Sequence, residues 1–125
     1  KRDLTHTDPQ DPLASSGATM KSCLQYVTNN LPQVVLFENV PGILGRIAGE
    51  DGRNIDKVYN QLYAAGYSCQ HAVFDSQSFM LPQRRRRVYA MATRGDIDPE
   101  CCAAWPRLVR ACSPLERIPL SACLL

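Results

Sequence analysis

A carboxylate at the end of an apolar run is the first candidate for chemistry in this sequence. Glu38-Asn39-Val40 closes the apolar run 32–37, and Gly42 follows before the next expected helix. Open α/β sheets bind their ligands at the carboxyl ends of strands, where a fixed carboxyl group can donate or accept a proton. A free glutamate titrates at about pH 4.3, so burial would have to raise the pKa of Glu38 for it to donate a proton at neutral pH.

A glutamine followed by consecutive arginines is the second candidate. Gln83 precedes the run Arg84–Arg87, and residues 88–92 form another apolar run. Guanidinium groups present planar pairs of donors that fit a phosphate or the edge of a base. Side chains alternate along a strand, so Arg85 and Arg87 should face one way and the other two arginines the opposite way. Taken alone, such a cluster is equally typical of a solvated surface or a nuclear import signal.

The elements that must position these motifs alternate between helix and strand. Apolar residues recur at helical spacing over 20–27, and Asn29-Asn30 should end that helix. The run 32–37 is apolar on both faces, which is typical of a central parallel strand. A second helix should begin at the N-cap Asn54 and end before Gly66, where a helix C-terminus favours positive φ.

Two strands are expected after the second helix, at 68–74 and 88–92, with a short connection between them. The order helix, strand, helix, strand, strand indicates the α/β class. The last part of the chain, 96–125, holds several prolines and no sustained period. Asp98 could cap a short helix there, but Pro106 would interrupt it.

Composition narrows the functional class. The net charge of +2 and the hydrophobic fraction of 45% are ordinary for a globular protein. No apolar run approaches the roughly 20 residues of a membrane span, so no membrane partner is expected. The 6 cysteines form no C-x-x-C pair, and no metal site is expected. Cys23 and Cys69 fall on expected apolar faces and predict buried free thiols, which fits a reduced compartment.

Together and in this order, the two motifs resemble those of the cytosine-C5 DNA methyltransferases. Glu38-Asn39-Val40 matches the family's Glu-Asn-Val motif, and Gln83, Arg85 and Arg87 match its Gln-x-Arg-x-Arg motif. The resemblance implies a partial Rossmann-like sheet of the S-adenosylmethionine-dependent methyltransferases. It also implies that the methyl group of S-adenosylmethionine is transferred to C5 of cytosine in double-stranded DNA.

The resemblance further implies roles for individual residues. Glu38 would face ring N3 of a cytosine flipped out of the duplex while a cysteine thiolate attacks C6. Arg85 and Arg87 would hold the catalytic loop and contact the flipped base and a nearby phosphate. Thr19 replaces part of a Leu-Phe pair that walls the family's cofactor pocket, which leaves it as the candidate cofactor contact. The expected DNA contacts are Asn39, Val40, Gln83, Arg84 and Arg86.

Two parts of the family's machinery do not occur in the sequence. It contains no Pro-Cys dipeptide to supply the nucleophile and no Phe-x-Gly-x-Gly cofactor loop. We therefore expect 1–95 to be the central part of a catalytic domain, and 96–125 to be a candidate start of the target-recognition region. The strand at 32–37 should then have an unpaired edge where the cofactor-binding half belongs. The isolated chain should be marginally stable and inactive.

The sequence is also compatible with other functions. An RNA cytosine-C5 methyltransferase would share the scaffold, although that branch tends to lack the glutamine present here as Gln83. A non-catalytic, methyltransferase-like module that binds nucleic acid would also keep the fold, although the motif residues are intact. An unrelated nucleotide-binding domain with 42–45 as its phosphate loop rests on too generic a spacing. The expected location is the nucleus in a eukaryotic host and the cytoplasm otherwise.

Overall fold

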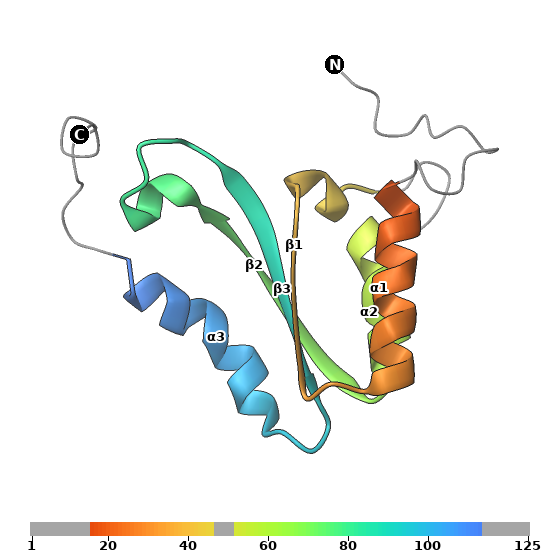
Figure 1. Ribbon diagram of the computed structural model, residues 1–125. Helices are drawn as coiled ribbons and strands as arrows, with labels where there is room; N and C mark the ends of the chain where they lie inside the picture. The colour runs from red at the N-terminus through yellow and green to blue at the C-terminus, as the bar shows by residue number, and fades with distance from the viewer. Residues whose placement is uncertain (1–15, 47–51, 114–125) are drawn as a thin grey trace.

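The computed structural model describes residues 16–46 and 52–113 of the chain (Figure 1). The expectations for residues 1–15 and 114–125 lie outside these ranges. The elements are α1 (Ser16–Asn30), β1 (Val34–Asn39), the 3-10 turn η1 (Pro41–Leu44), α2 (Asn54–Ala64), β2 (Tyr67–Asp75), the 3-10 turn η2 (Ser76–Phe79), β3 (Arg86–Arg94) and α3 (Pro99–Ala111). The expected order of helix, strand, helix, strand, strand is confirmed, and a third helix follows it.

The strands form one sheet in which β3 lies in the centre, in the order β1-β3-β2. Both pairings with β3 are antiparallel, with Glu38 opposite Tyr89 and Asp75 opposite Arg86. Helices α1 and α2 cover one face of the sheet, and α3 covers the other (Figure 1). The sheet is therefore a layer between helices, as in other α/β folds.

The strand at 32–37 does not have the position that its composition suggested. Within the described sheet β1 lies at an edge and pairs with β3 in antiparallel fashion, so the prediction of a central parallel strand is wrong there. Val35 and Phe37 pack against the cluster under α1 and α2, whereas Val34 and Leu36 are 51% and 62% exposed. The apolar side chains of a strand indicate which of its faces are buried. They do not indicate which other strands pair with its backbone.

The main core lies between α2 and the sheet. The amphipathic stripe of α2 is buried as its spacing predicts, and Ile55 and Leu62 are fully inaccessible to solvent. On the sheet it meets small side chains of β3, Ala90 and Ala92, which are also fully buried. Small residues in a central strand let the helix approach the sheet closely. This packing is the main source of stability that the structure shows.

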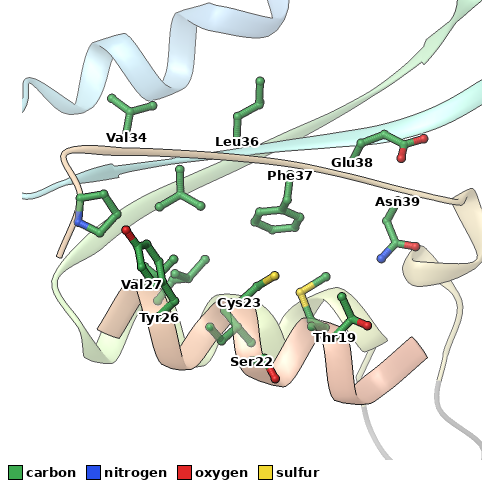
Figure 2. Close-up of a pocket in the computed structure, with 15 residues that line it drawn as sticks. Thr19, Ser22, Cys23, Tyr26, Val27, Val34, Leu36, Phe37, Glu38 and Asn39 are labelled. Atoms are coloured by element: carbon green, nitrogen blue, oxygen red, sulfur yellow. The ribbon is translucent and has the colours of Figure 1, made fainter. Parts of the chain in front are cut away.

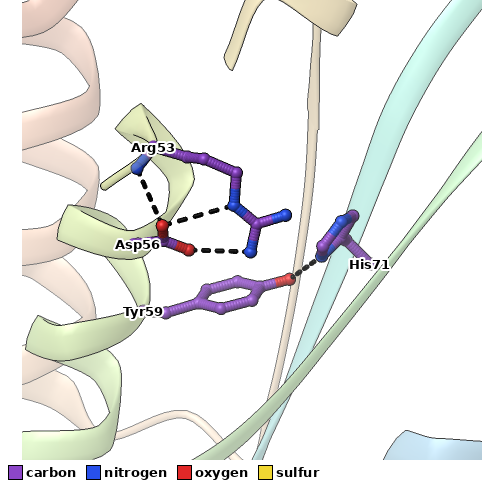
Figure 3. Close-up of polar contacts among 4 residues, drawn as sticks. All are labelled: Arg53, Asp56, Tyr59 and His71. Carbon is purple, nitrogen blue, oxygen red and sulfur yellow. Dashed lines mark hydrogen bonds and ion pairs between the residues drawn. The ribbon is translucent and has the colours of Figure 1, made fainter. Parts of the chain in front are cut away.

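The ends of α2 differ in how well the sequence predicts them. The N-cap is Arg53 and not Asn54, because the carboxylate of Asp56 accepts the backbone N–H of Arg53 at 2.8 Å and pairs with its guanidinium at 2.9 Å (Figure 3). Asp56 thus serves the backbone from inside the helix, and the residue before Asn54 becomes the boundary. At the other end Gly66 has φ +83, as expected for a residue that follows a helix.

The helix α3 runs through its internal proline. The side chain of Asp98 accepts the backbone N–H of Glu100 at 2.9 Å, and Pro99 stands in the first turn. Pro106 does not interrupt the helix, contrary to expectation. Its ring is buried beside Trp105, which packs edge-on against Phe74 with ring centroids 5.6 Å apart. Burial of this face offsets the one helical hydrogen bond that proline removes.

A set of hydrogen bonds holds the turn between α1 and β1. Arg94 donates from Nη1 to the carbonyl of Leu31 at 2.6 Å, and the hydroxyl of Tyr67 donates to the carbonyl of Pro32 at 2.6 Å. Leu31 itself has φ 47, the left-handed region that a leucine rarely adopts. The bonds from β2 and β3 therefore fix a strained residue and set the direction in which β1 leaves the helix.

The carboxylate of Asp96 should make the stability of the fold depend on pH in the acid range. Hydrogen bonds from Arg94, at 2.7 Å and 2.8 Å, lower the pKa of Asp96 from its usual 3.8 to about 2. A carboxylate with a lowered pKa stabilises the fold above pH 3.8, and this stabilisation is lost as the pH falls towards 2. In urea unfolding between pH 5 and pH 2, Asp96→Asn should flatten the pH dependence. An equally steep acid loss in the variant would contradict this assignment.

Candidate active site

The structure brings the two sequence motifs together on neighbouring strands. Glu38 is near the end of β1 and Arg87 is near the start of β3, and Oε1 of Glu38 lies 2.7 Å from Nε of Arg87. Tyr89 is the residue opposite Glu38 in the ladder, so Arg87 is its diagonal neighbour on the same face. Two of the three expected catalytic residues are therefore in direct contact.

This ion pair is open to solvent. The side chains of Glu38 and Arg87 are 44% and 24% exposed. The described residues therefore leave the Glu38 side chain largely open to solvent, because β1 is the edge of the sheet there. An exposed pair adds little to stability, so its importance lies in its geometry. A carboxylate that accepts and a guanidinium that donates face the same space and could grip the edge of a base.

The remaining residues of the arginine motif lie before β3. The Arg84 side chain approaches Asp75, with Nε of Arg84 3.4 Å from Oδ2, and Arg85 is held through its backbone N–H, 3.0 Å from Oδ1 of the same carboxylate. The backbone carbonyl of Gln83 accepts a hydrogen bond from the Ser76 hydroxyl. Because β3 begins at Arg86, strand alternation applies only from that residue onwards. The side chains of this whole run are exposed, apart from the half-buried Arg87.

Asn39 lies on the other side of the strand from Glu38. Its Oδ1 accepts the backbone N–H of Val40 at 2.8 Å, which turns the chain from β1 into η1. Figure 2 shows Asn39 and Phe37 directed towards α1, whereas Glu38 and Leu36 point the opposite way. The structure therefore does not bring Asn39 to Arg87, and Asn39 and Val40 serve the end of the strand.

A cleft of about 700 Å³ separates α1 from β1. Thr19 and Asn39 contribute polar groups to its lining, and Met20 and Phe37 contribute apolar ones (Figure 2). Cys23 also lines this cleft and is exposed, so its predicted burial is wrong: the buried face of α1 is carried by Leu24 and Val27. Cys69 is half-buried, and burial together with Cys102 raises the pKa of its thiol to about 12.

A second cleft, of about 460 Å³, lies on the α3 side of the same strand. Half of its lining residues are aromatic, and Leu36 of β1 also lines it; the aromatic residues are Phe74, Phe79, Tyr89 and Trp105. Apolar clefts thus flank both faces of β1, whose outer edge is unpaired among the residues that the structure describes. Such an arrangement is typical of a strand that another strand and its covering helices would complete.

Two interactions near the site were not predicted from the sequence. The carboxylate of Asp75 binds the side chain of Arg84 and the backbone N–H of Arg85. In the sequence, only the position of Asp75 between a strand and a turn could have suggested these contacts. The hydroxyl of Tyr59 lies 3.0 Å from Nδ1 of His71 and ties α2 to β2 (Figure 3). Burial and the nearby Arg53 lower the pKa of His71, so the ring is neutral near pH 7.

The described ranges contain no helix with the length and apolar character of a membrane span. Nor do they bring together three or more His, Cys, Asp or Glu side chains in a way that could hold a metal ion.

Known proteins match this chain over most of its length. The model of the family "C-5 cytosine-specific DNA methylase" matches residues 11–115. The type II methyltransferase M.MspI of Moraxella is 28% identical over 78 residues, which are 62% of this chain and 18% of that protein. M.BsuFI of Bacillus subtilis is 32% identical, over 59% of this chain and 17% of its own length. The DNA (cytosine-5-)-methyltransferase DMT5 of Cryptococcus neoformans is 31% identical, over 66% of this chain and 3% of its own.

A solved structure agrees at the level of the fold. The Dnmt2 methyltransferase of S. pombe superposes with a TM-score of 0.51 and 23% identity, covering 75% of this chain and 28% of that one. The described residues thus have part of the fold of the Rossmann-like methyltransferases, as predicted. The chain spans less than a fifth of the length of the three relatives named above. Since the family model covers most of the sequence and both of its motifs, this chain belongs to the C-5 cytosine-specific DNA methylases.

Proposed function

We propose that the chain is the central part of a catalytic domain that transfers a methyl group from S-adenosylmethionine to C5 of cytosine in duplex DNA. Family membership supports the reaction class, and the 2.7 Å contact between Glu38 and Arg87 is the observation that carries the proposal. A flipped cytosine offers a ring nitrogen and a carbonyl as acceptors and an amino group as donor. Glu38 and Arg87 match these groups with one carboxyl and one guanidinium.

In the proposed reaction, Glu38 is the residue that donates a proton to the base. Attack of a thiolate on C6 forms a C–S bond and moves the electrons of the C5=C6 bond towards N3. The Glu38 carboxyl gives its proton to N3, which leaves a neutral enamine that is nucleophilic at C5. C5 then takes the methyl group of S-adenosylmethionine, which leaves as S-adenosylhomocysteine. A general base then takes the C5 proton, the C–S bond at C6 breaks to release the thiolate, and N3 returns its proton to Glu38, which restores the aromatic ring. Arg87 holds Glu38 in place and donates to the base. The thiolate must come from a Pro-Cys segment outside these residues, because the sequence contains no such dipeptide.

The described residues provide at most one wall for the cofactor. Apolar side chains such as Met20 and Phe37 suit an adenine ring, but the cleft beside α1 offers few partners for an ammonium, a carboxylate and a ribose. S-adenosylmethionine would supply the methyl group, and Thr19 stays the candidate contact from this chain. Val34 and Leu36, exposed along the edge of β1, support the docking of a further strand with the cofactor-binding half of the sheet.

The proposal is tested in a chimaera of M.MspI in which residues 11–115 of this chain, which the family model matches, replace the corresponding segment of that enzyme. Transfer of radiolabelled methyl groups from S-adenosylmethionine to duplex DNA is the expected result. A folded chimaera that binds DNA without transferring methyl groups would support a binding module instead. Transfer to RNA but not to DNA would favour the RNA methyltransferase. Circular dichroism of the chimaera shows whether it is folded.

A further inference from the structure

The carboxylate of Asp75 organises the chain that leads into β3. Asp75 is the last residue of β2, and its Oδ1 accepts the backbone N–H of Gln77 at 3.2 Å and that of Arg85 at 3.0 Å. Its Oδ2 lies 3.4 Å from Nε of Arg84. One side chain therefore binds both ends of the connection between the two strands, although Gln77 and Arg85 are far apart in sequence.

The connection itself is mostly exposed, so side-chain burial contributes little to its path. The 3-10 turn η2 contains no buried residue, and Met80 at its end has φ 67. The neighbouring Ser76 adds two backbone bonds to the same place: its N–H donates to the carbonyl of Arg85 at 3.1 Å, and its hydroxyl donates to the carbonyl of Gln83. Phe79 packs edge-on against Phe74 in the middle of the connection, with ring centroids 5.7 Å apart, and polar contacts at Asp75 and Ser76 join its two ends.

The arginine run contains no residue that would fix its own position. Four identical side chains cannot specify by themselves which of them faces Glu38. A shift of one residue would send each side chain to the other face of the sheet. The buried residues of β3 fix the register from Val88 onwards, and Asp75 lies opposite Arg86, directly before that point.

We propose that Asp75 is a positioning residue, whose carboxylate fixes the path of the Gln83–Arg86 segment into β3 so that its arginines meet nucleic acid beside Glu38. This inference rests on the proposed function, because it assumes that the arginines contact DNA. Burial alone would raise the pKa of Asp75, but the backbone N–H groups of Gln77 and Arg85 and the charge of Arg84 hold it below its usual value. Asp75 is therefore an anion at neutral pH.

The experiment measures binding of the full chain to a short fluorescent DNA duplex by anisotropy, at several salt concentrations. Asp75→Ala should bind about tenfold more weakly than the wild type, equivalent to the loss of one charge-assisted hydrogen bond. Its dependence on salt should also be shallower, since fewer phosphates are neutralised. This result is opposite in sign to the effect of charge alone, because removing an acid should strengthen binding to DNA.

Two variants serve as matched controls. Asp98→Ala removes another aspartate that accepts a backbone N–H two residues later, at the start of α3, and changes the charge equally. It should bind DNA as tightly as the wild type or more tightly. Asp75→Asn keeps an oxygen that can accept from Gln77 and Arg85, and it should restore wild-type binding. Equal effects of Asp75→Ala and Asp98→Ala would overturn the inference, as would equal weakening by Asp75→Asn and Asp75→Ala.

Hydrogen exchange of the Arg85 amide separates this inference from the proposed function. In Asp75→Ala this amide should exchange faster than in the wild type, while the amide of Ala90 in the centre of β3 keeps its protection. A wild-type chain that does not bind DNA would count against the proposed function. Faster exchange at Arg85 would then still support the positioning role, and unchanged exchange would refute it.

Discussion

Replacing Glu38 with glutamine should lower methyl transfer by the M.MspI chimaera about 10²–10⁴-fold, the range that a general acid contributes. Glutamine has the shape of glutamate and can still accept a hydrogen bond from Arg87, which lies 2.7 Å from the carboxylate. It cannot give a proton to N3 of the cytosine, so C5 would not become nucleophilic. Single-turnover rates with excess enzyme report this step directly.

The matched control for this prediction is Glu100→Gln. Glu100 is an exposed acid in the first turn of α3, so its replacement removes the same charge away from the Glu38–Arg87 pair. Its single-turnover rate should equal that of the unmodified chimaera, and both variants should bind DNA with similar affinity. Equal rates for Glu38→Gln and the unmodified chimaera would remove Glu38 from the chemistry.

Replacing Leu62 with alanine should destabilise the isolated chain by about 2–5 kcal/mol. Leu62 is fully buried where α2 meets the sheet, and truncation leaves a cavity in the main core. A small domain has only about 5–15 kcal/mol of stability, so the variant should be close to unfolding at room temperature. Urea unfolding followed by far-ultraviolet circular dichroism measures the loss.

Leu108→Ala provides the comparison for Leu62. The same side chain is removed from α3, but Leu108 is 59% exposed, and its loss should change the stability by no more than about 0.5 kcal/mol. A similar loss in the two variants would mean that α2 does not carry the main core.

The helices and the order of elements follow closely from the sequence because local patterns specify them. The stripe of α2 and the positive φ of Gly66 depend on neighbours within a few residues, and both are found as predicted. The place of β1 in the sheet depends on its backbone pairing with β3, which lies far along the chain. The side chains of β1 do not indicate this pairing. Pro106 was misjudged because the packing of α3 onto Phe74 is also non-local.

The candidate site also has features that the sequence predicts and features that it does not. Glu38 and Arg87 were predicted to act together because each belongs to a recognisable motif, and the structure places them in contact. The exposure of Glu38 could not be predicted, because it depends on which strands are neighbours in the sheet. The hydrogen bond from the Arg85 backbone N–H to Asp75 could not be predicted either, because it depends on the conformation of the connection between β2 and β3. The assigned roles in DNA and cofactor binding stay predictions, as does the division of the chain at residue 95.

In the sheet formed by the described residues, one edge of β1 is unpaired, and this has a consequence for how such an enzyme could be made. Strand pairing needs backbone groups of two segments but no peptide bond between them, so two polypeptides can share one sheet. A methyltransferase divided next to β1 would be active only when both pieces are present at concentrations above their mutual dissociation constant. Its methylation of DNA would then report on the encounter of two separately synthesised chains.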